Sequence, residues 1–283
     1  MKPTAMLTGS TGYAGQNLLR FWFQQGDWDV VCVDRSTGFD FAGHGWEARL
    51  PERDVDVVVH LAQSRRYREF PASAQDMFRV NVAGTAALLE WSRRHRVKRF
   101  LFASTGTVYV PRAGKLTESA ECAPTSMYAA TKLCSELLMQ PYSDFFEVVI
   151  ARLFGLYGPG QQQMLIADTI HKVRAGQEIL LAGGVGIYLT PLFIDDCVKV
   201  LSTLAVVPLE KACTVVNVAG DDLLSLGEIV HEIADQLQIR PVIKAMDGLP
   251  KYLCGDNTRL KAFYRNAFLP FRTGLAFTLR SRG

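Results

Sequence analysis

The stretch Leu7-Thr8-Gly9-Ser10-Thr11-Gly12-Tyr13-Ala14-Gly15 decides the fold of this 283-residue chain. An apolar run, Ala5-Met6-Leu7, leads into it, and an amphipathic segment from Gln16 to Gln25 follows it. A strand, a glycine-rich turn and a helix in this order begin a βαβ unit. Amide groups at the start of such a helix attract negative charge, and glycines let that charge approach the backbone. A tight turn without a ligand is the alternative that this stretch leaves open.

A carboxylate follows at the spacing that is typical of a dinucleotide site. The second apolar run, Val30-Val31-Cys32-Val33, ends in Asp34, 19 positions after Gly15. In a dinucleotide-binding βαβ unit, an acidic residue about 20 positions beyond the glycines binds the adenosine ribose. The turn and Asp34 together therefore predict a dinucleotide site at the start of the chain.

Strands alternate with helices along the rest of the chain, which predicts a parallel sheet with right-handed crossovers. The interval between Asp34 and Val55 is too short for a further complete strand and helix. We expect strands over 55–62, 98–105, 147–153, 178–181, 192–194 and 214–218, and helices over 74–94, 127–140, 166–175, 195–206 and 225–237. Ser225, with Glu228 three residues later, can cap the last of these helices.

The predicted fold class is α/β: a doubly wound parallel sheet of the Rossmann type with a smaller C-terminal α/β lobe that binds substrate. We expect residues 1–154 to form the dinucleotide-binding domain, with 187–219 returning to it. Residues 155–186 and 220–283 form the substrate-binding lobe in this prediction, because glycines and a proline between 155 and 160 break regular structure.

Composition excludes several classes of protein. The net charge is only +3 and no Lys/Arg block is longer than a pair, so we expect no nucleic acid partner. Six scattered cysteines without a Cys-x-x-Cys pair favour a reducing compartment over disulfides, and no metal-ligand spacing occurs. We expect no signal peptide, because the chain goes directly into a predicted strand, and no apolar run reaches about 18 residues. We expect a cytoplasmic protein that does not span a membrane.

A tyrosine and a lysine lie one helical turn apart in Tyr128-Ala129-Ala130-Thr131-Lys132. A free phenol, with a pKa of about 10, is a poor base at neutral pH, and a nearby ammonium lowers that pKa. The hydroxyl of Thr105, at the end of a predicted strand, can hold a substrate oxygen during proton transfer. A plain surface pair is the alternative for Tyr128 and Lys132.

These motifs together resemble the extended short-chain dehydrogenases/reductases, in the NAD-dependent epimerase/dehydratase group that acts on nucleotide sugars. The resemblance runs nearly end to end. It rests on the glycine turn and on His60-Leu61-Ala62, Asn81-Val82-Ala83-Gly84-Thr85, Ser104-Thr105-Gly106-Thr107-Val108-Tyr109, Tyr128 to Lys132, Arg152, Tyr157-Gly158-Pro159-Gly160-Gln161 and Phe193-Ile194-Asp195-Asp196.

The resemblance implies an enzyme with Tyr128 as acid/base, assisted by Lys132 and Thr105. Its cofactor is NAD, with NADP left open because Arg35 can pair with a 2′-phosphate. The implied cofactor-binding residues are Gly9, Thr11, Gly12, Tyr13, Gly15, Asp34, Arg35, Asp40, Phe41, Leu61, Ala62, Tyr128 and Lys132. Asp40 and Phe41 flank adenine in this view, although Asp40 can equally cap a turn. Asn81 and His60 are expected to be structural.

The chain departs from the family at several positions. Dehydratases of the family tend to have Asp-Glu where this chain has Gly106-Thr107. Asn and Arg-Asp, which commonly contact the nucleotide diphosphate, are replaced by Gly155 and by Leu189-Thr190. Either the substrate is not a UDP- or GDP-sugar, or its phosphate contacts move to other cations, for which the candidates are Arg65, Arg66, Lys172 and Arg174.

The favoured function is sugar-nucleotide 4-epimerisation through a transient ketone. The alternatives are a net NAD(P)H-dependent reductase or dehydrogenase of a sugar nucleotide or another hydroxyl or keto substrate, and a non-catalytic NAD(P)-binding protein. The resemblance also implies a homodimer through the helices 74–94 and 127–140, packed as a four-helix bundle.

Overall fold

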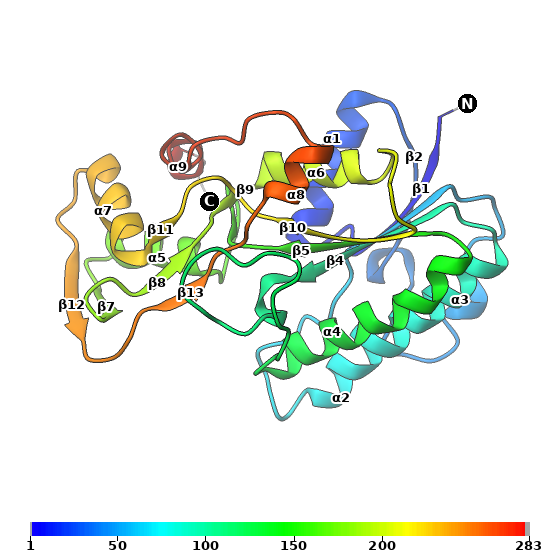
Figure 1. Cartoon of the computed structure of the whole chain (residues 1–283), viewed down its shortest axis with the longest axis horizontal. Helices are drawn as coiled ribbons and strands as arrows, with labels where there is room; N and C mark the ends of the chain where they lie inside the picture. The colour runs from blue at the N-terminus through cyan, green and yellow to red at the C-terminus, as the bar shows by residue number, and fades with distance from the viewer. Residues whose placement is uncertain (1, 281–283) are drawn as a thin grey trace. The chain divides into compact units, whose positions relative to one another are not determined.

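Strand β1 (Thr4–Thr8) lies inside a parallel sheet, with β2 (Asp29–Val33) on one side and β3 (Val57–His60) on the other. In the computed structural model, which describes residues 2–280, six strands form this sheet in the order β10-β5-β4-β3-β1-β2 (Figure 1). Beyond β3 the sheet continues with β4 (Arg99–Thr105) and β5 (Glu147–Leu153) and ends at β10 (Cys213–Val218). All side chains of β3 and β4 are buried, which explains their nearly continuous apolar sequence. The predicted α/β fold is confirmed.

Helices cover both faces of the sheet, as a doubly wound fold requires (Figure 1). Helices α1 (Tyr13–Gln25) and α6 (Ile194–Leu204) lie on one face, and α3 (Gly84–Arg94) and α4 (Met127–Met139) lie on the other. The indole Nε1 of Trp22 on α1 donates to Ser202 Oγ on α6 at 2.9 Å. Ser126 caps α4 by accepting a hydrogen bond from the Ala129 amide at 3.2 Å.

The predicted helix over 74–94 is continuous but is not uniformly α-helical. It begins as α2 (Ala74–Met77), widens into a π-helical segment (Phe78–Ala83) and ends as α3. Inside the wide turn, the carbonyl of Asn81 accepts hydrogen bonds from Ser135 Oγ on α4, at 2.7 Å, and from Thr85 Oγ1, at 2.5 Å. Apolar periodicity shows the extent of a helix but does not reveal such a local change in winding.

The short interval after β2 contains no further strand, as the sequence predicts. Residues 35–54, all described, form two single 3-10 turns, Arg35–Thr37 and Glu47–Arg49, within a loop. The rings of Phe41 and Trp46 are buried beneath this loop, with centroids 4.5 Å apart in an edge-to-face contact. The two buried rings therefore hold this loop against the core, in the interval that is too short for a further strand and helix.

The described residues form two compact units. Unit 1 consists of residues 2–110, 121–152 and 198–216, and unit 2 of residues 111–120, 153–197 and 217–280. Residues 111–120 join unit 2 through hydrogen bonds from Leu116 N to Cys254 O and from Asn217 Nδ2 to Leu116 O, both 2.7 Å. The predicted division placed this segment in the first domain and returned 187–219 to it, whereas 198–216 belongs to unit 1 here.

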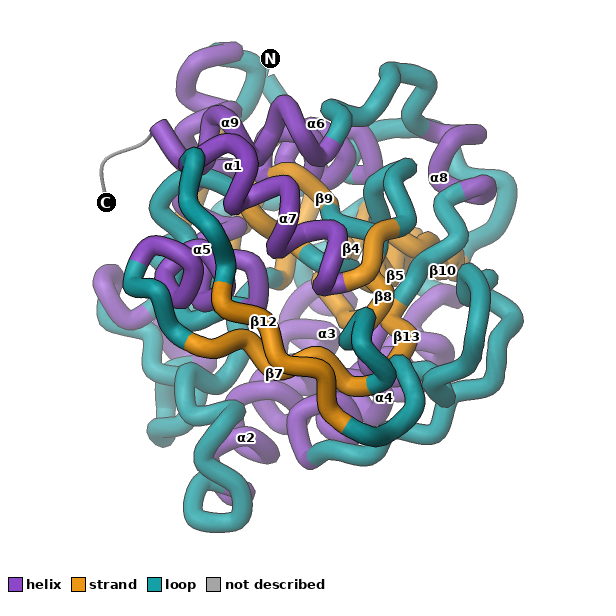
Figure 2. The backbone as a smooth tube through the Cα atoms, turned by 90° about the vertical axis from the view of Figure 1, so that its left-hand side faces the viewer, coloured by secondary structure: helices purple, strands orange, loops and turns teal. Residues whose placement is uncertain are grey.

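Unit 2 is built from small sheets and helices. Strands β7 (Glu178–Ala182) and β12 (Val242–Met246) pair in parallel, as Figure 2 shows. The remaining strands are β6 (Leu156–Tyr157) with β9 (Leu192–Phe193), and β8 (Ile187–Leu189) between β11 (Leu224–Ser225) and β13 (Lys251–Leu253). The helices are α5 (Leu165–Arg174), α7 (Leu226–Leu237), α8 (Thr258–Phe263) and α9 (Phe271–Arg280). The predicted cap of α7, made by Ser225 and Glu228, is confirmed. Among residues 2–280, none of the helices has the length and apolar character needed to cross a bilayer.

The turn between β1 and α1 is so closely packed that two of its glycines have no space for a side chain. Gly9 has φ +71°, and a Cβ there would lie 2.7 Å from the Ala62 nitrogen. A Cβ at Gly15 would lie 2.1 Å from the Gly9 carbonyl oxygen. Gly12, whose amide donates to the Gly9 carbonyl at 2.9 Å, has more room, because its nearest neighbour would be 3.2 Å away.

We expect Gly15→Ala to lower the free energy of unfolding by about 3 kcal/mol or more, because a methyl group must displace backbone rather than a flexible side chain. Gly12→Ala, in the same turn, is the matched control and should cost less than half as much. Urea unfolding followed by circular dichroism measures both variants. Equal losses in the two variants would contradict this account of the turn.

Candidate active site

The N-terminus of α1 is the first part of the candidate site. Because β1, β3 and β4 are parallel, their carboxyl ends meet at one edge of the sheet, where this helix begins. The first turn of α1, which is fully described, contains no acidic side chain that would neutralise its amides. Thr11 Oγ1 accepts a hydrogen bond from Arg65 Nη2 at 3.1 Å, which brings a guanidinium to the turn. Gly12 precedes α1 and Tyr13 begins it, so this end of the helix suits an anionic group.

Asp34 lies at the end of β2, where its carboxylate reaches back to the glycine turn. It accepts hydrogen bonds from the hydroxyl of Ser10 and, at 2.8 and 2.6 Å, from the amide and hydroxyl of Ser36. Burial raises the pKa of Asp34, but these bonds and the Thr37 amide outweigh it, so that the pKa lies below its ordinary value. The carboxylate is therefore ionised at neutral pH and fixed beside the turn.

The neighbours of Asp34 are bound within their own loop. Arg35 Nε and Asp40 Oδ1 form an exposed ion pair at 3.2 Å, and the same oxygen accepts from the Ala42 amide. Asp40 thus caps a turn, which is one of the two readings of its sequence. The ring of Phe41 packs into the core, 6.2 Å from the imidazole of His60. The predicted adenine contacts of Asp40 and Phe41 stay predictions.

The segment after β3 runs along the glycine turn. The Leu61 amide donates to the Thr8 carbonyl, and the Ala62 amide donates to Thr8 Oγ1, both at 3.2 Å. His60 is buried between two hydroxyls, with its Nδ1 2.6 Å from Thr8 Oγ1 and its Nε2 2.9 Å from Thr85 Oγ1. Burial, followed by the charge of Lys132, lowers the pKa of His60 to about 3. His60 is thus a buried, hydrogen-bonded histidine, which agrees with the expected structural role.

The phenol of Tyr128 is half-buried, in the first turn of α4. Its hydroxyl donates to Gln63 Oε1 at 3.1 Å, and its ring lies 5.2 Å from that of Tyr67. Burial and, after it, the Tyr67 phenol raise the pKa of Tyr128, while a hydrogen bond with Thr105 opposes them. The expected lowering of this pKa is therefore not found. Thr105 Oγ1 also lies 2.9 Å from Thr107 Oγ1, so hydroxyls cluster around the phenol.

Lys132 is almost completely buried one helical turn beyond Tyr128. Its ammonium donates to the Ala103 carbonyl at 2.8 Å and lies 4.6 Å from the centre of the Phe102 ring. Burial lowers the pKa of Lys132 to about 7, although the carboxylate of Glu136 acts in the opposite direction. An amine with this pKa changes its charge near neutral pH, which makes it sensitive to any charge placed beside it.

A buried ion pair between Glu136 and Arg152 lies one helical turn beyond Lys132. Glu136 accepts hydrogen bonds from Arg152 Nη2, at 2.6 Å, and from the hydroxyl of Ser104, directly before Thr105. The Arg152 guanidinium also lies 4.6 Å from the ring centre of Tyr109. Ser104 lies near the end of β4, and Arg152 lies near the end of β5. Their contacts with Glu136 therefore join α4 to both strands at the sheet edge where Thr105 lies.

Sequence reasoning missed four of these residues as parts of the site. Glu136 follows Lys132 by four positions, and this spacing could have revealed it. Arg152 contributed only to the family resemblance. Gln63 and Tyr67 lie in a loop without any motif, so no sequence signal identified them.

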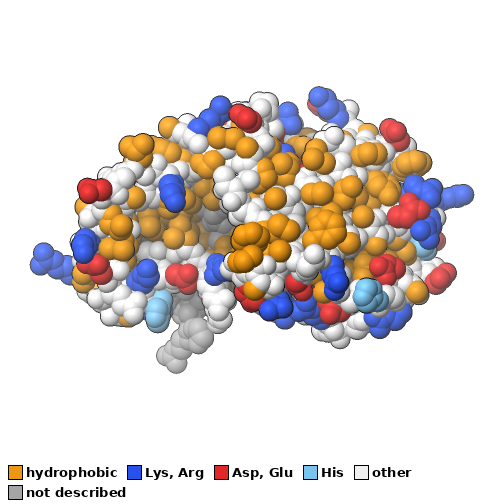
Figure 3. Space-filling view, turned by 90° about the horizontal axis from the view of Figure 1, so that it is seen from below, with side chains coloured by type: hydrophobic (Ala, Val, Ile, Leu, Met, Phe, Trp, Pro, Cys, Tyr) orange, Lys and Arg blue, Asp and Glu red, His pale blue; other side chains and the backbone are white. Residues whose placement is uncertain are grey.

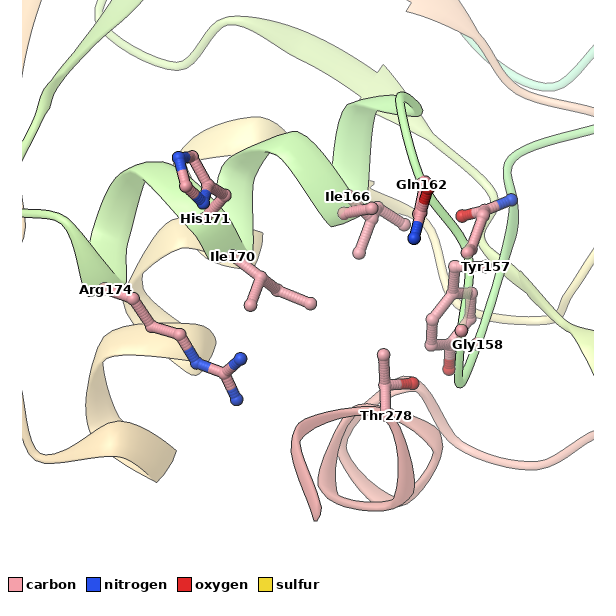
Figure 4. Close-up of a pocket in the computed structure, with 11 residues that line it drawn as sticks. Tyr157, Gly158, Gln162, Ile166, Ile170, His171, Arg174 and Thr278 are labelled. Carbon is pink, nitrogen blue, oxygen red and sulfur yellow. The ribbon is translucent and has the colours of Figure 1, made fainter. Parts of the chain in front are cut away.

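The four candidate phosphate-binding cations lie in different environments. Arg65 lies at the glycine turn, whereas Arg66 pairs with Glu69 at 2.8 Å. Arg174 lines a pocket of about 150 Å³ within unit 2, between α5, α9 and the loop after β6, and its Nη2 donates to the Leu279 carbonyl at 3.0 Å (Figure 4). Lys172 is exposed on α5. The structure therefore places one candidate beside the glycine turn and one in a pocket of unit 2.

Comparison with known proteins gives consistent results. The chain is 28% identical over 256 residues to a UDP-glucose epimerase of Bacillus subtilis (strain 168) that is described as uncharacterized, covering 81% of each chain. It is 30% identical over 251 residues to a dTDP-glucose 4,6-dehydratase of Streptomyces griseus, covering 80% of this chain and 76% of the dehydratase. Among solved structures, MoeE5 in complex with UDP-glucose and NAD superimposes with a TM-score of 0.83 at 25% identity, covering 98% of this chain and 97% of the other.

A sequence model of one family matches residues 5–219, about three quarters of the chain. The match spans the glycine turn, Tyr128 and Lys132. The chain belongs to the NAD dependent epimerase/dehydratase family, whose members are enzymes that act on nucleotide sugars.

Proposed function

We propose that the protein binds NAD(H) in unit 1 and interconverts two nucleotide sugars that differ in configuration at C4. The observation that carries this proposal is the position of the Tyr128 phenol. It lies at the same sheet edge as the glycine turn, where it hydrogen-bonds with Thr105 and Gln63, and Thr107 in turn lies 2.9 Å from the Thr105 hydroxyl. Hydroxyl and amide groups around one phenol suit proton exchange with a sugar hydroxyl.

The residues at the glycine turn fit a dinucleotide. The α1 amides and the Arg65 guanidinium suit a pyrophosphate, and the ionised Asp34 suits the ribose hydroxyls. NAD supplies the hydride acceptor and donor for the sugar carbon. Gly9 and Gly15 support this site indirectly, because a side chain at either position would not fit into the turn.

Three side chains divide the proton chemistry between them. Tyr128 takes the proton of the sugar hydroxyl and returns it to the ketone oxygen. Thr105, which hydrogen-bonds with the phenol, holds the sugar oxygen in line. Lys132 supplies positive charge behind the phenol, and Glu136 helps to keep it charged against the effect of burial.

Epimerisation is favoured over dehydration because the chain has no carboxylate directly after Thr105. Water elimination needs an acid and a base near the sugar, whereas Gly106 and Thr107 have neither. The Thr107 amide donates instead to Thr105 Oγ1 at 3.2 Å, so this segment orients a hydroxyl.

A net reductase is the second candidate, and one experiment separates it from an epimerase. Purified protein is analysed by native mass spectrometry for bound nucleotides and then incubated with UDP-glucose, UDP-glucuronic acid or dTDP-glucose. An epimerase produces the C4 epimer without added cofactor, whereas a reductase consumes NAD(P)H in equal amount to its product. A protein that retains no dinucleotide and converts none of these sugars would contradict both candidates.

We expect Tyr128→Phe to lower turnover by about 10²–10⁴-fold while NAD affinity stays within about twofold, because only one hydroxyl is removed. Lys132→Ala should lower both turnover and NAD affinity, since the ammonium would also hold the nicotinamide ribose. Single-turnover kinetics and fluorescence titration with NADH measure the two effects. Turnover of Tyr128→Phe at the wild-type rate would remove the phenol from the mechanism.

We expect NAD to bind at least about tenfold more tightly than NADP, because the ionised Asp34 repels a 2′-phosphate. Asp34→Asn should reduce this preference, and Arg35→Ala should leave it intact, since Arg35 is paired with Asp40. Calorimetric titration with both nucleotides measures the ratio. Tighter binding of NADP to the unmodified protein would show that attraction of the 2′-phosphate by Arg35 outweighs its repulsion by Asp34.

We also propose a homodimer through the helices 74–94 and 127–140. Large apolar side chains are exposed on or next to these helices: Phe78, Leu137 and Phe145 are 49%, 56% and 62% exposed. Figure 3, which views the molecule from the side of α2, α3 and α4, shows hydrophobic side chains among the charged ones on this face. Large exposed apolar side chains on one face favour association.

We expect light scattering at about 10 μM to give twice the mass of the chain, and Leu137→Glu to give the single mass. Leu249→Glu, at an 87% exposed leucine in unit 2, is the control and should leave the dimer intact. A monomeric unmodified protein would contradict the proposed dimer.

A further inference from the structure

Gln63 occupies a defined position beside the phenol of Tyr128. The residues on both sides of it are fixed, because the Ala62 amide donates to Thr8 Oγ1 at 3.2 Å and the Ser64 amide donates to Asn81 Oδ1 at 2.8 Å. Asn81 in turn donates through Nδ2 to Thr131 Oγ1, at 2.9 Å, on the helix that carries Tyr128. Loop and helix are thus tied together, and the contact between Gln63 and Tyr128 follows from that connection.

The direction of this contact matters chemically. The phenol O–H donates and the carboxamide Oε1 accepts, at 3.1 Å. An acceptor stabilises the neutral phenol and has no proton with which to stabilise a phenolate. A carboxamide oxygen also does not remove the proton, because an amide is a very weak base.

The other described groups near the phenol come from the same loop, from α4 and from β4. On the loop, the Tyr67 ring lies 5.2 Å from that of Tyr128, and the Arg68 guanidinium lies 5.3 Å from the centre of the Tyr67 ring. On α4, the Lys132 ammonium donates to the Ala103 carbonyl, and Glu136 pairs with Arg152. On β4, Thr105 favours the phenolate. Gln63 and Thr105 therefore act on the phenol in opposite directions.

We propose that Gln63 is a positioning residue that keeps Tyr128 in its protonated form and aims its O–H, so that the resting site is prepared to act as an acid. This inference rests on the proposed function. A substrate hydroxyl that is to be oxidised must displace the Gln63 carboxamide from the phenol. A ketone oxygen that is to be protonated meets a phenol that already has its proton. Gln63 is thus a determinant of the pH range over which the site works.

Two variants that change the acceptor in opposite ways test the proposal. Gln63→Ala removes the acceptor, and Gln63→Glu replaces it with a charged one. In the NAD-loaded protein, the alkaline limb of the rate against pH should move down by about 0.5–1 pH unit in Gln63→Ala and up by about one unit in Gln63→Glu. Gln75→Ala, at an exposed glutamine of α2, should leave the limb in place. If the alkaline limb moves in the same direction in Gln63→Ala and Gln63→Glu, or moves in neither variant, the proposal is overturned.

A second measurement works without any substrate, so that failure of the proposed function can be recognised separately. Tyrosine labelled with carbon-13 at Cζ gives a resonance for Tyr128 that Tyr128→Phe identifies. At pH 8, the loss of a hydrogen bond in Gln63→Ala should shift this resonance, whereas Gln75→Ala should not. Gln63→Met, which keeps the chain length, replaces the alanine variant if that variant does not fold. An unchanged resonance in a folded Gln63 variant would overturn the proposal, whichever sugar the protein converts.

Discussion

Four hydrogen bonds meet at the buried side chain and carbonyl of Asn81. The side chain accepts from the Ser64 amide and donates to Thr131, while the carbonyl accepts from Thr85 and Ser135. These bonds join the loop after β3, the wide turn of the helix and α4. Because buried amide groups are costly to leave without partners, this junction specifies one arrangement of the three segments. The position of the phenol on α4 relative to the glycine turn follows from it.

The buried pair of Glu136 and Arg152 adds a second constraint. Removing two charges from water is expensive, and only close geometry with further hydrogen bonds offsets that cost. Here the carboxylate has both the guanidinium and the Ser104 hydroxyl, so β4 and β5 are fixed against α4. Asn81 fixes the loop after β3 relative to Tyr128, and Glu136 fixes the ends of β4 and β5 relative to the same helix. The chemistry of the phenol and of Lys132 therefore depends on groups that never need to contact a ligand.

Much of the fold could be predicted because its signals are local and repeated. The buried strand Val57–His60 is apolar at nearly every position, and the Ser225 cap depends on four consecutive residues. Charge states were harder to predict. A lysine near Tyr128 suggests a lowered pKa, but burial, which acts over distances that sequence does not reveal, raises it. The same limit applies to Gln63, whose role arises from loop anchoring through Thr8 and Asn81 rather than from any motif.

The short loop after Asp34 has a consequence for the border of the sheet. Because residues 35–54 contain no strand, β2 is an edge of the sheet, and an edge strand can pair with a foreign chain. β2 is only five residues long, and its first residue, Asp29, forms an ion pair with Arg53. Thr37 Oγ1 donates to the Cys32 carbonyl at 3.0 Å, so the loop itself occupies one backbone acceptor of the strand. Shortness, charge and a covering hydroxyl together oppose strand addition here, so the loop that replaced a strand also protects the chain against aggregation through this edge.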